Sequence, residues 1–314
     1  MVERKIGSRA GPGGRYRLSE LTISLAPPDP PSPGWASFAV PLLERARAAG
    51  VTTFDLTSAP RPPLAEEILL RAFPRPDPEL VAIVRAPGGA PSRSPTRAPA
   101  GADRSPPARP LEETLGRLAG RFGLIVEWRP TAGGTGRLPD SLAARKADGT
   151  VLDVATPIGP DEEVGSLAPS TVRTGPLSLL EPQTAIAIHA GTPPDGFALI
   201  ARDVFAGGAL DGSLLEGPAV PRGPAAPPLD LGDLRRRLAP VLSLGFLTEG
   251  HRRTLAQAAV RFALHWPWVL TAVVPLPTPE RYSALFEGEF GPELSDDELR
   301  RLGAGPAGET RPPR

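Results

Sequence analysis

Few residue types in this chain can carry covalent or metal chemistry. The sequence has no cysteine and three histidines. Without thiols, the chain forms no disulfide, no thiolate metal site and no iron–sulfur cluster. His189, His251 and His265 lie far from the spacing of metal ligands, so we expect no metal site. The candidates that remain are charged and aromatic side chains at the ends of expected strands.

Three candidate site residues, Asp55, Arg85 and Trp128, each stand at or just after the end of an expected strand. In a parallel barrel the carboxyl ends of the strands meet at one face, where active sites form. Asp55 and Arg85 are expected to pair there, either to orient a ligand or as a structural ion pair. Trp128 would form an aromatic floor for a flat or cationic ligand, or fill the cavity. Glu127 has the opposite strand parity and is expected to face the outer helices.

Other candidates carry weaker signals. Arg202 and Asp203 follow an expected strand and could bind an anionic ligand. The segment 87–110 holds four arginines among Gly, Ala, Ser and Pro, so it is expected to be a disordered loop, with an acidic partner or phosphate as its alternative use. His189 lies in a Pro/Gly-rich stretch and is expected to be a surface residue.

Strand-like and helix-like segments alternate along the chain. The expected strands span 18–25, 51–55, 80–84, 124–128, 151–155, 170–174, 197–201 and 269–274. The expected helices span 37–49, 64–73, 111–122, 141–147, 161–167, 229–241, 252–266, 279–286 and 296–302. Alternation with continuous apolar strands is typical of a parallel sheet with helical crossovers. Eight units favour an α/β fold, a closed (β/α)8 TIM barrel with an N-terminal hairpin and long Pro/Gly-rich loops.

Composition sets the domain organisation. The chain has 314 residues with 43 prolines and 34 glycines, yet its 40% hydrophobic content predicts a packed core. We expect a flexible arm at 1–14, a single barrel at 15–302 and a flexible tail at 303–314. The 35 basic and 35 acidic residues cancel, so nothing favours nucleic acid or an anionic membrane as partner. No secretory signal or apolar stretch of membrane-spanning length is seen, so a cytoplasmic protein is expected.

Five segments, in order, resemble the aldo-keto reductase family. They are RLSELTISL at 17–25, ARAAGVTTFD at 46–55, LEETLGRLAGRFGLIVEWRP at 111–130, LIARDVFAGGALDG at 199–212 and LAQAAVRFALHWPWVLTAVVPLPTPERY at 255–282. They are similar to the family's opening hairpin, second strand, a helix–strand pair with an "HRP"-like turn, the pyrophosphate loop and the closing nucleotide loop. The resemblance implies a (β/α)8 barrel, carbonyl reduction and NADP(H).

The resemblance also implies a catalytic tetrad that this chain lacks. The family uses a Tyr general acid, a Lys that lowers its pKa, an Asp that orients the Lys, and a His. The Asp is kept as Asp55, but Pro60, Arg85 and Trp128 stand at the Tyr, Lys and His positions. Proline has no acidic proton, and neither an indole nor a guanidinium titrates as a tuned acid. Loss of a general acid typically removes about 10²–10⁴-fold in rate.

The cofactor positions are kept in part. Gly207 and Gly208 allow a backbone to approach a phosphate closely. Arg281 matches an arginine that holds the 2′-phosphate in family members, whereas Arg202 stands where an aromatic ring stacks on the nicotinamide. We therefore expect no cofactor, with NADP(H) binding as the alternative.

Three functions follow from this pattern. The first is an aldo-keto reductase-like pseudoenzyme that has lost classical carbonyl reduction and binds a small molecule or a protein partner, as a scaffold or accessory subunit. The second is an NADPH-dependent oxidoreductase with rebuilt acid–base groups, for example a water held by Asp55 and Arg85. The third is a non-redox enzyme that uses the barrel pocket.

Overall fold

The barrel strands close on themselves in the order β10-β3-β4-β5-β6-β7-β8-β9, all parallel. The fold comes from a computed structural model, which describes residues 6–25, 35–59, 62–86, 111–129, 138–158, 172–191, 195–214, 231–276 and 291–304. The strands are β3 (Leu21–Ser24), β4 (Thr53–Asp55), β5 (Val81–Arg85), β6 (Gly123–Glu127), β7 (Asp153–Pro157), β8 (Val172–Pro176), β9 (Ala198–Arg202) and β10 (Val269–Pro275). The expected α/β barrel is thereby confirmed.

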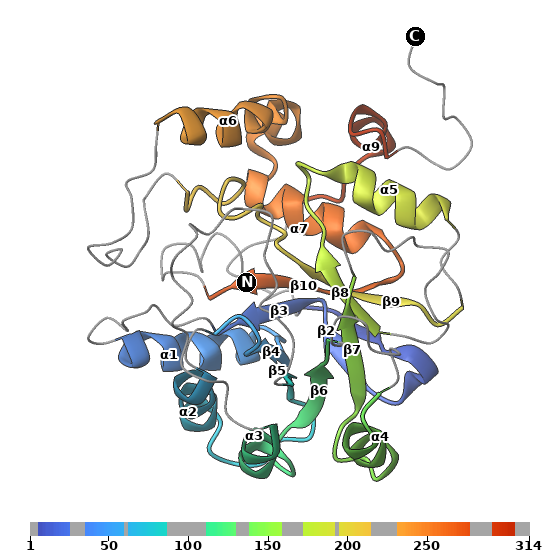
Figure 1. Ribbon diagram of the computed structural model, residues 1–314. Helices are drawn as coiled ribbons and strands as arrows, with labels where there is room; N and C mark the ends of the chain where they lie inside the picture. Colours follow the sequence, from blue (N-terminus) through green and yellow to red (C-terminus); the bar gives the residue numbers. More distant parts are fainter. Residues whose placement is uncertain are drawn as a thin grey trace.

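Helices connect the strands and surround the barrel (Figure 1). They are α1 (Trp35–Ala48), α2 (Pro62–Ala72), α3 (Leu111–Leu118), α4 (Asp140–Ala147), α5 (Pro182–Ala190), α6 (Leu231–Leu242), α7 (Leu255–His265) and α9 (Asp296–Arg301), with short 3-10 turns η1 (Pro12–Gly14) and η3 (Gly245–His251). Helix α7 begins with a capping box of Thr254 and Gln257, in which each side chain satisfies the other's backbone N–H. This explains why the strongest helical pattern in the sequence starts where it does.

Each barrel strand has one face toward the barrel axis and one toward the helices. On β5, Val81 and Ile83 belong to the inner apolar cluster, whereas Ala82 and Val84 belong to the layer between strands and helices. This follows from the two-residue period of a strand. Because both layers are apolar, the strand sequences are continuous hydrophobic runs. The alternation decides which residues at the strand ends reach the barrel axis.

The amino-terminal end of the chain differs from the expected flexible arm at 1–14. Residues 8–10 form β1 (Ser8–Ala10), which pairs antiparallel with β2 (Arg17–Ser19). The Arg9 guanidinium donates hydrogen bonds of 2.6–2.9 Å to three main-chain carbonyls, those of Leu264, Trp266 and Val269. Arg9 thus fastens the hairpin to the end of α7 and the start of β10, an anchor that composition does not reveal.

Tyr16 fills the barrel at the amino-terminal ends of the strands. Its hydroxyl donates a 3.1 Å hydrogen bond to Asp153 Oδ2, and the other Asp153 oxygen pairs with Lys146. Burial, and then the neighbouring Asp153 charge, raise the pKa of Tyr16 above its ordinary value, so the phenol stays protonated. A Cβ on Gly11 would lie 2.2 Å from the Tyr16 ring, so only glycine fits there.

Helix α5 is the main element that the sequence pattern missed. His189 was expected in a Pro/Gly-rich stretch but lies in α5, exposed, with its ring 5.2 Å from the Trp266 ring. The helix begins with Pro182, whose fixed φ suits a first turn, and its alanine-rich sequence has no clear polar face. Without an amphipathic period, the helical signal is lost.

Several expectations lie outside the described residues. They concern Pro60, the 87–110 loop, Arg281, the helices expected at 161–167 and 279–286, and residues 305–314 of the expected tail. Among the described helices, none combines the length and apolar character needed to cross a bilayer.

We predict that Tyr16→Phe lowers the free energy of unfolding by about 1–3 kcal/mol, because it leaves a buried Asp153 oxygen without its donor. Urea denaturation followed by circular dichroism measures the loss. Ser8→Ala, an exposed change in the same hairpin, is the control and should cost less than about 0.5 kcal/mol. Equal stability of Tyr16→Phe and wild type would contradict a structural role for the hydroxyl.

Candidate functional site at the barrel mouth

Polar side chains gather at the carboxyl ends of the strands, inside the barrel. On β9, Ala198 and Ile200 face inward, so Arg202, two residues on, faces inward too. The same period brings Asp55, Arg85, Glu127 and Thr174 to this end from β4, β5, β6 and β8. We call these five residues the mouth network.

Asp55 and Arg202 form the centre of the mouth network. Arg202 Nη1 and Nη2 each lie 3.0 Å from one oxygen of the fully buried Asp55 carboxylate, a bidentate pair. Asp55 Oδ1 also accepts hydrogen bonds from the Thr57 hydroxyl at 2.8 Å and the Thr57 N–H at 3.3 Å. We expected Asp55 to pair with Arg85; instead its partner comes from the far side of the barrel, because Arg85 has another carboxylate to bind.

That second carboxylate is Glu127. Its Oε2 lies 3.0 Å from Arg202 Nη2 and accepts a 3.1 Å hydrogen bond from the Thr174 hydroxyl. Its Oε1 lies 3.4 Å from Arg85 Nη2. Glu127 was expected to face the outer helices, and this was wrong: it shares the inward face of Ile125. A lone charged residue in an apolar strand needs a charged partner, and the layer beneath the helices is apolar.

Trp128 lies where Glu127 was expected. Its side chain is half-buried against the apolar layer between the strands and the helices. Glu127 therefore holds the inward position at the end of β6, the position that the resemblance had given to Trp128 through the "HRP"-like turn. The sequence therefore assigned the two residues to the opposite faces from those they occupy, because a shift of one residue along a strand reverses the face.

The charges of the mouth network stabilise one another. Burial alone would raise the pKa of Asp55, but the Arg202 charge and the hydrogen bonds from Arg202 and Thr57 hold it below its usual range. Burial acts to lower the pKa of Arg202, and the Asp55 and Glu127 carboxylates more than offset it, so the guanidinium stays charged. Two carboxylates and two guanidinium groups thus meet with no net charge.

This arrangement binds and orients charge, but Asp55 and Arg202, its central pair, are poor proton sources. A carbonyl reductase needs an acid near neutral pH within reach of the developing alkoxide. Asp55 is held as an acceptor, and the neighbouring carboxylates keep the Arg202 guanidinium charged. Of the two tyrosines, Tyr16 is at the opposite end of the barrel, and Tyr282 is outside the described residues.

The loop after β9 carries the expected cofactor glycines. The Gly207 N–H donates to Asp203 Oδ1 at 2.7 Å, and the Gly208 N–H donates to the Phe205 carbonyl at 3.1 Å. A Cβ on Gly208 would lie 2.2 Å from the Ser213 hydroxyl, so close packing within the loop accounts for this glycine. Both amides that a phosphate would need are already used.

The described residues therefore do not fit a nicotinamide cofactor in the family's manner. Arg202, where a ring would stack, is instead bound to two carboxylates. In the loop that follows Arg202, the Gly207 and Gly208 amides donate to acceptors within the same loop.

The closed eight-stranded parallel barrel, with an antiparallel hairpin before its first strand, defines the fold class as a (β/α)8 TIM barrel. A scan against protein-family models gives no match, and a search of curated proteins finds no similar sequence. Solved structures do match over nearly the whole chain.

Three of these structures are aldo-keto reductases or carry that family's designation. They are the aldo-keto reductase AKR11C1 from Bacillus halodurans in its holo form (TM-score 0.60, 13% identity, 95% of each chain), the glycerol dehydrogenase AKR11B4 from Gluconobacter oxydans (0.60, 17%, 100% of each chain) and the thermostable aldo-keto reductase Tm1743 in complex with the inhibitor epalrestat (0.61, 14%, 95% of this chain and 98% of that chain). At these identities the likeness establishes a shared fold.

We predict that Arg202→Gln lowers the free energy of unfolding by about 3–5 kcal/mol, because it leaves two buried carboxylates without their common partner. Chemical denaturation measures the change. Arg145→Gln, which breaks an exposed pair with Glu112, is the matched control and should cost about 1 kcal/mol or less. Similar losses in both variants would show that Arg202 is not the centre of the network.

We predict an acid-dependent difference between wild type and Asp55→Asn. The folded-state pKa of Asp55 is depressed, so its ion pair contributes full stability above the ordinary aspartate pKa of about 3.9 and loses it as the pH falls further. The stability gap between the two proteins should therefore be constant from about pH 7 to pH 5 and shrink below about pH 4. Asp297→Asn, an exposed site, should show little gap at any pH. A gap that widens on acidification would refute the assignment.

Proposed function

We propose that this chain is a divergent member of the aldo-keto reductase family that has lost classical carbonyl reduction and acts as a binding or accessory subunit. Its family origin is supported by the five resembling segments and by the shared barrel fold. We place it in the cytoplasm, where a chain without cysteine needs no disulfide.

The observation that carries the proposal is the position of Arg202. Its guanidinium bridges Asp55 and Glu127 across the mouth, with contacts of 3.0 Å to each. Displacing this side chain would leave two carboxylates without a counter-charge, which is costly in a buried site. A ligand in the mouth must therefore bind on top of the mouth network and not in place of Arg202.

Arg85 is the outermost member of the mouth network. Its side chain is 36% exposed and contacts Glu127 on one side only, at 3.4 Å. A guanidinium that keeps free N–H donors binds planar anionic groups well. The mouth is therefore suited to hold an anionic small molecule or an acidic side chain of a partner, with Arg85 as the contact.

The second candidate is an NADPH-dependent oxidoreductase with a rebuilt acid–base site. It is favoured by Glu127, a carboxyl at the inward position of β6. The family resemblance had led us to expect the Trp128 indole at that position. In this alternative Glu127 would supply or relay the proton that the family's tyrosine provides.

An NADPH experiment separates the two candidates. We predict that isothermal titration shows no saturable NADPH binding up to about 1 mM, a free energy of only about 4 kcal/mol, and that no aldehyde in a broad panel is reduced. The reason is that Arg202 is already bound to two carboxylates and that the Gly207 and Gly208 amides already donate within the loop after β9.

Saturable NADPH consumption would overturn this proposal in favour of the oxidoreductase, provided that Glu127→Gln reduces it about 10²-fold or more. Glu112→Gln, an exposed carboxylate on α3, is the matched control and should leave any such activity unchanged. Mass spectrometry of small molecules and proteins that copurify with the natively purified chain would then identify the ligand or partner.

A further inference from the structure

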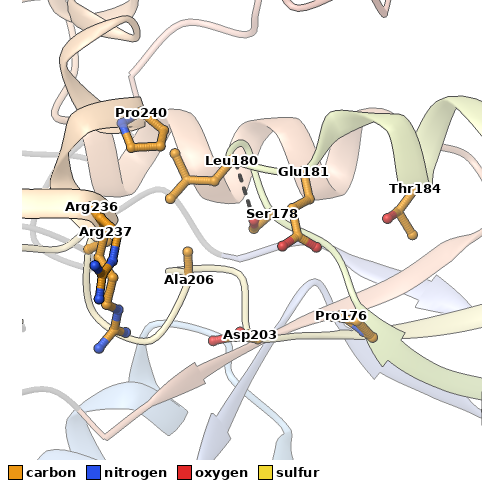
Figure 2. A pocket seen from close by; sticks show the side chains of 11 residues that line it. Pro176, Ser178, Leu180, Glu181, Thr184, Asp203, Ala206, Arg236, Arg237 and Pro240 are labelled. Atoms are coloured by element: carbon orange, nitrogen blue, oxygen red, sulfur yellow. Dashed lines mark hydrogen bonds between the residues drawn. The ribbon is translucent and has the colours of Figure 1, made fainter. Parts of the chain in front are cut away.

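A cavity lies outside the mouth network, between the loops after β8 and β9 and helices α5 and α6. Its volume is about 260 Å³, and no residue that lines it belongs to the mouth network. Figure 2 shows Arg236 and Arg237 of α6 on one side, with Glu181 and Thr184 on the other. A role for this cavity is therefore independent of whether the barrel mouth reduces carbonyl compounds.

Polar groups in this cavity have hydrogen-bonding capacity left over. Within the described residues, the Arg237 guanidinium makes one hydrogen bond, a 3.3 Å contact with the Gly207 carbonyl, and no ion pair. Glu181 stands at the start of α5, but its side chain does not cap the helix. Ser178 Oγ is buried and accepts from the Leu180 N–H, which leaves its own O–H to be donated.

The cavity floor is held in an unusual backbone conformation. Asp203 and Ala206 line it with φ of 52° and 50°, in the left-handed region that non-glycine residues seldom adopt. Ala206 lacks the polar side chain that stabilises such a conformation in aspartate. Strain of this kind is found disproportionately at ligand sites, where the surrounding structure maintains it.

The arrangement selects a chemical class of ligand. One wall carries guanidinium groups, which bind phosphate or carboxylate. The opposite wall carries the Glu181 carboxylate and two hydroxyls, which match ligand hydroxyl groups. A cavity of about 260 Å³ admits a small molecule.

We propose that this cavity is a binding site for a small hydroxylated anion, with its phosphate or carboxylate on Arg237 and its hydroxyls toward Glu181, Ser178 and Thr184. Such a site on the outer side of the β9 loop would let the chain sense a metabolite even without catalysis at its mouth.

The test uses isothermal titration of the full-length chain with two probes, glycerol 3-phosphate and malate, which distinguish a phosphate site from a carboxylate site. Glycerol and inorganic phosphate, each tested alone, report whether both halves of the ligand are needed. We expect saturable binding of one probe with a dissociation constant of about 1 mM or below, and weaker binding of the separate halves.

Variants locate the site. Arg237→Gln should weaken the binding about tenfold or more, whereas Arg235→Gln, an exposed arginine of the same helix that does not line the cavity, should leave it unchanged. If Arg237→Gln proves unstable, Arg237→Lys is used in its place. It keeps the charge and should retain part of the affinity. Absence of saturable binding for both probes, equal loss in the Arg235 and Arg237 variants, or a loss in Arg85→Gln alone would overturn the proposal.

Discussion

The interior of this barrel depends on one guanidinium that neutralises two buried carboxylates. Arg202 crosses the mouth and binds Asp55 with two hydrogen bonds, one from Nη1 and one from Nη2. The same Nη2 also contacts Glu127. Each of these groups would be costly to bury alone, and together they are stable only in this arrangement. The identity of the residue at the end of β9 therefore governs both how the mouth is held together and what it can admit.

The buried carboxylates at the two ends of the barrel are satisfied by different partners. At the amino-terminal end, Asp153 is shared by Lys146 and the Tyr16 hydroxyl. At the carboxyl end, where ligands of such barrels bind, two carboxylates face two guanidinium groups. The described phenol thus serves packing and closure, and burial and the Asp153 charge keep its proton in place. At the mouth, by contrast, the charged groups hold one another in place through ion pairs.

The sequence was sufficient for the order of the barrel strands and of most described helices, α5 excepted, because each buried strand is a short apolar run and most helices keep an amphipathic period. It was not sufficient to predict which side of a strand faces the barrel axis. In β6 the residues before Glu127 are all apolar, so no alternation distinguishes the inner face from the outer one. The sequence therefore placed Trp128 on the inner face and Glu127 on the outer one, the reverse of the structure. The pairing of Asp55 with Arg202 joins positions 147 residues apart and could not be inferred from spacing. Arg85 was correctly placed at the mouth, but its partner was not. The anchoring of β1 by Arg9 was missed for the same reason, since its acceptors are backbone carbonyls that have no sequence signature.

Those Arg9 contacts also constrain how the protein is made. The guanidinium near the start of the chain binds carbonyls 255 to 260 positions later, and β3 completes the cylinder only by pairing with β10. While the chain emerges from the ribosome, β3 has an unsatisfied edge until β10 has been synthesised. Non-local closure of this kind slows folding and prolongs exposure of strand edges. The edges of the growing sheet are therefore expected to stay open to association with other chains until β10 pairs with β3.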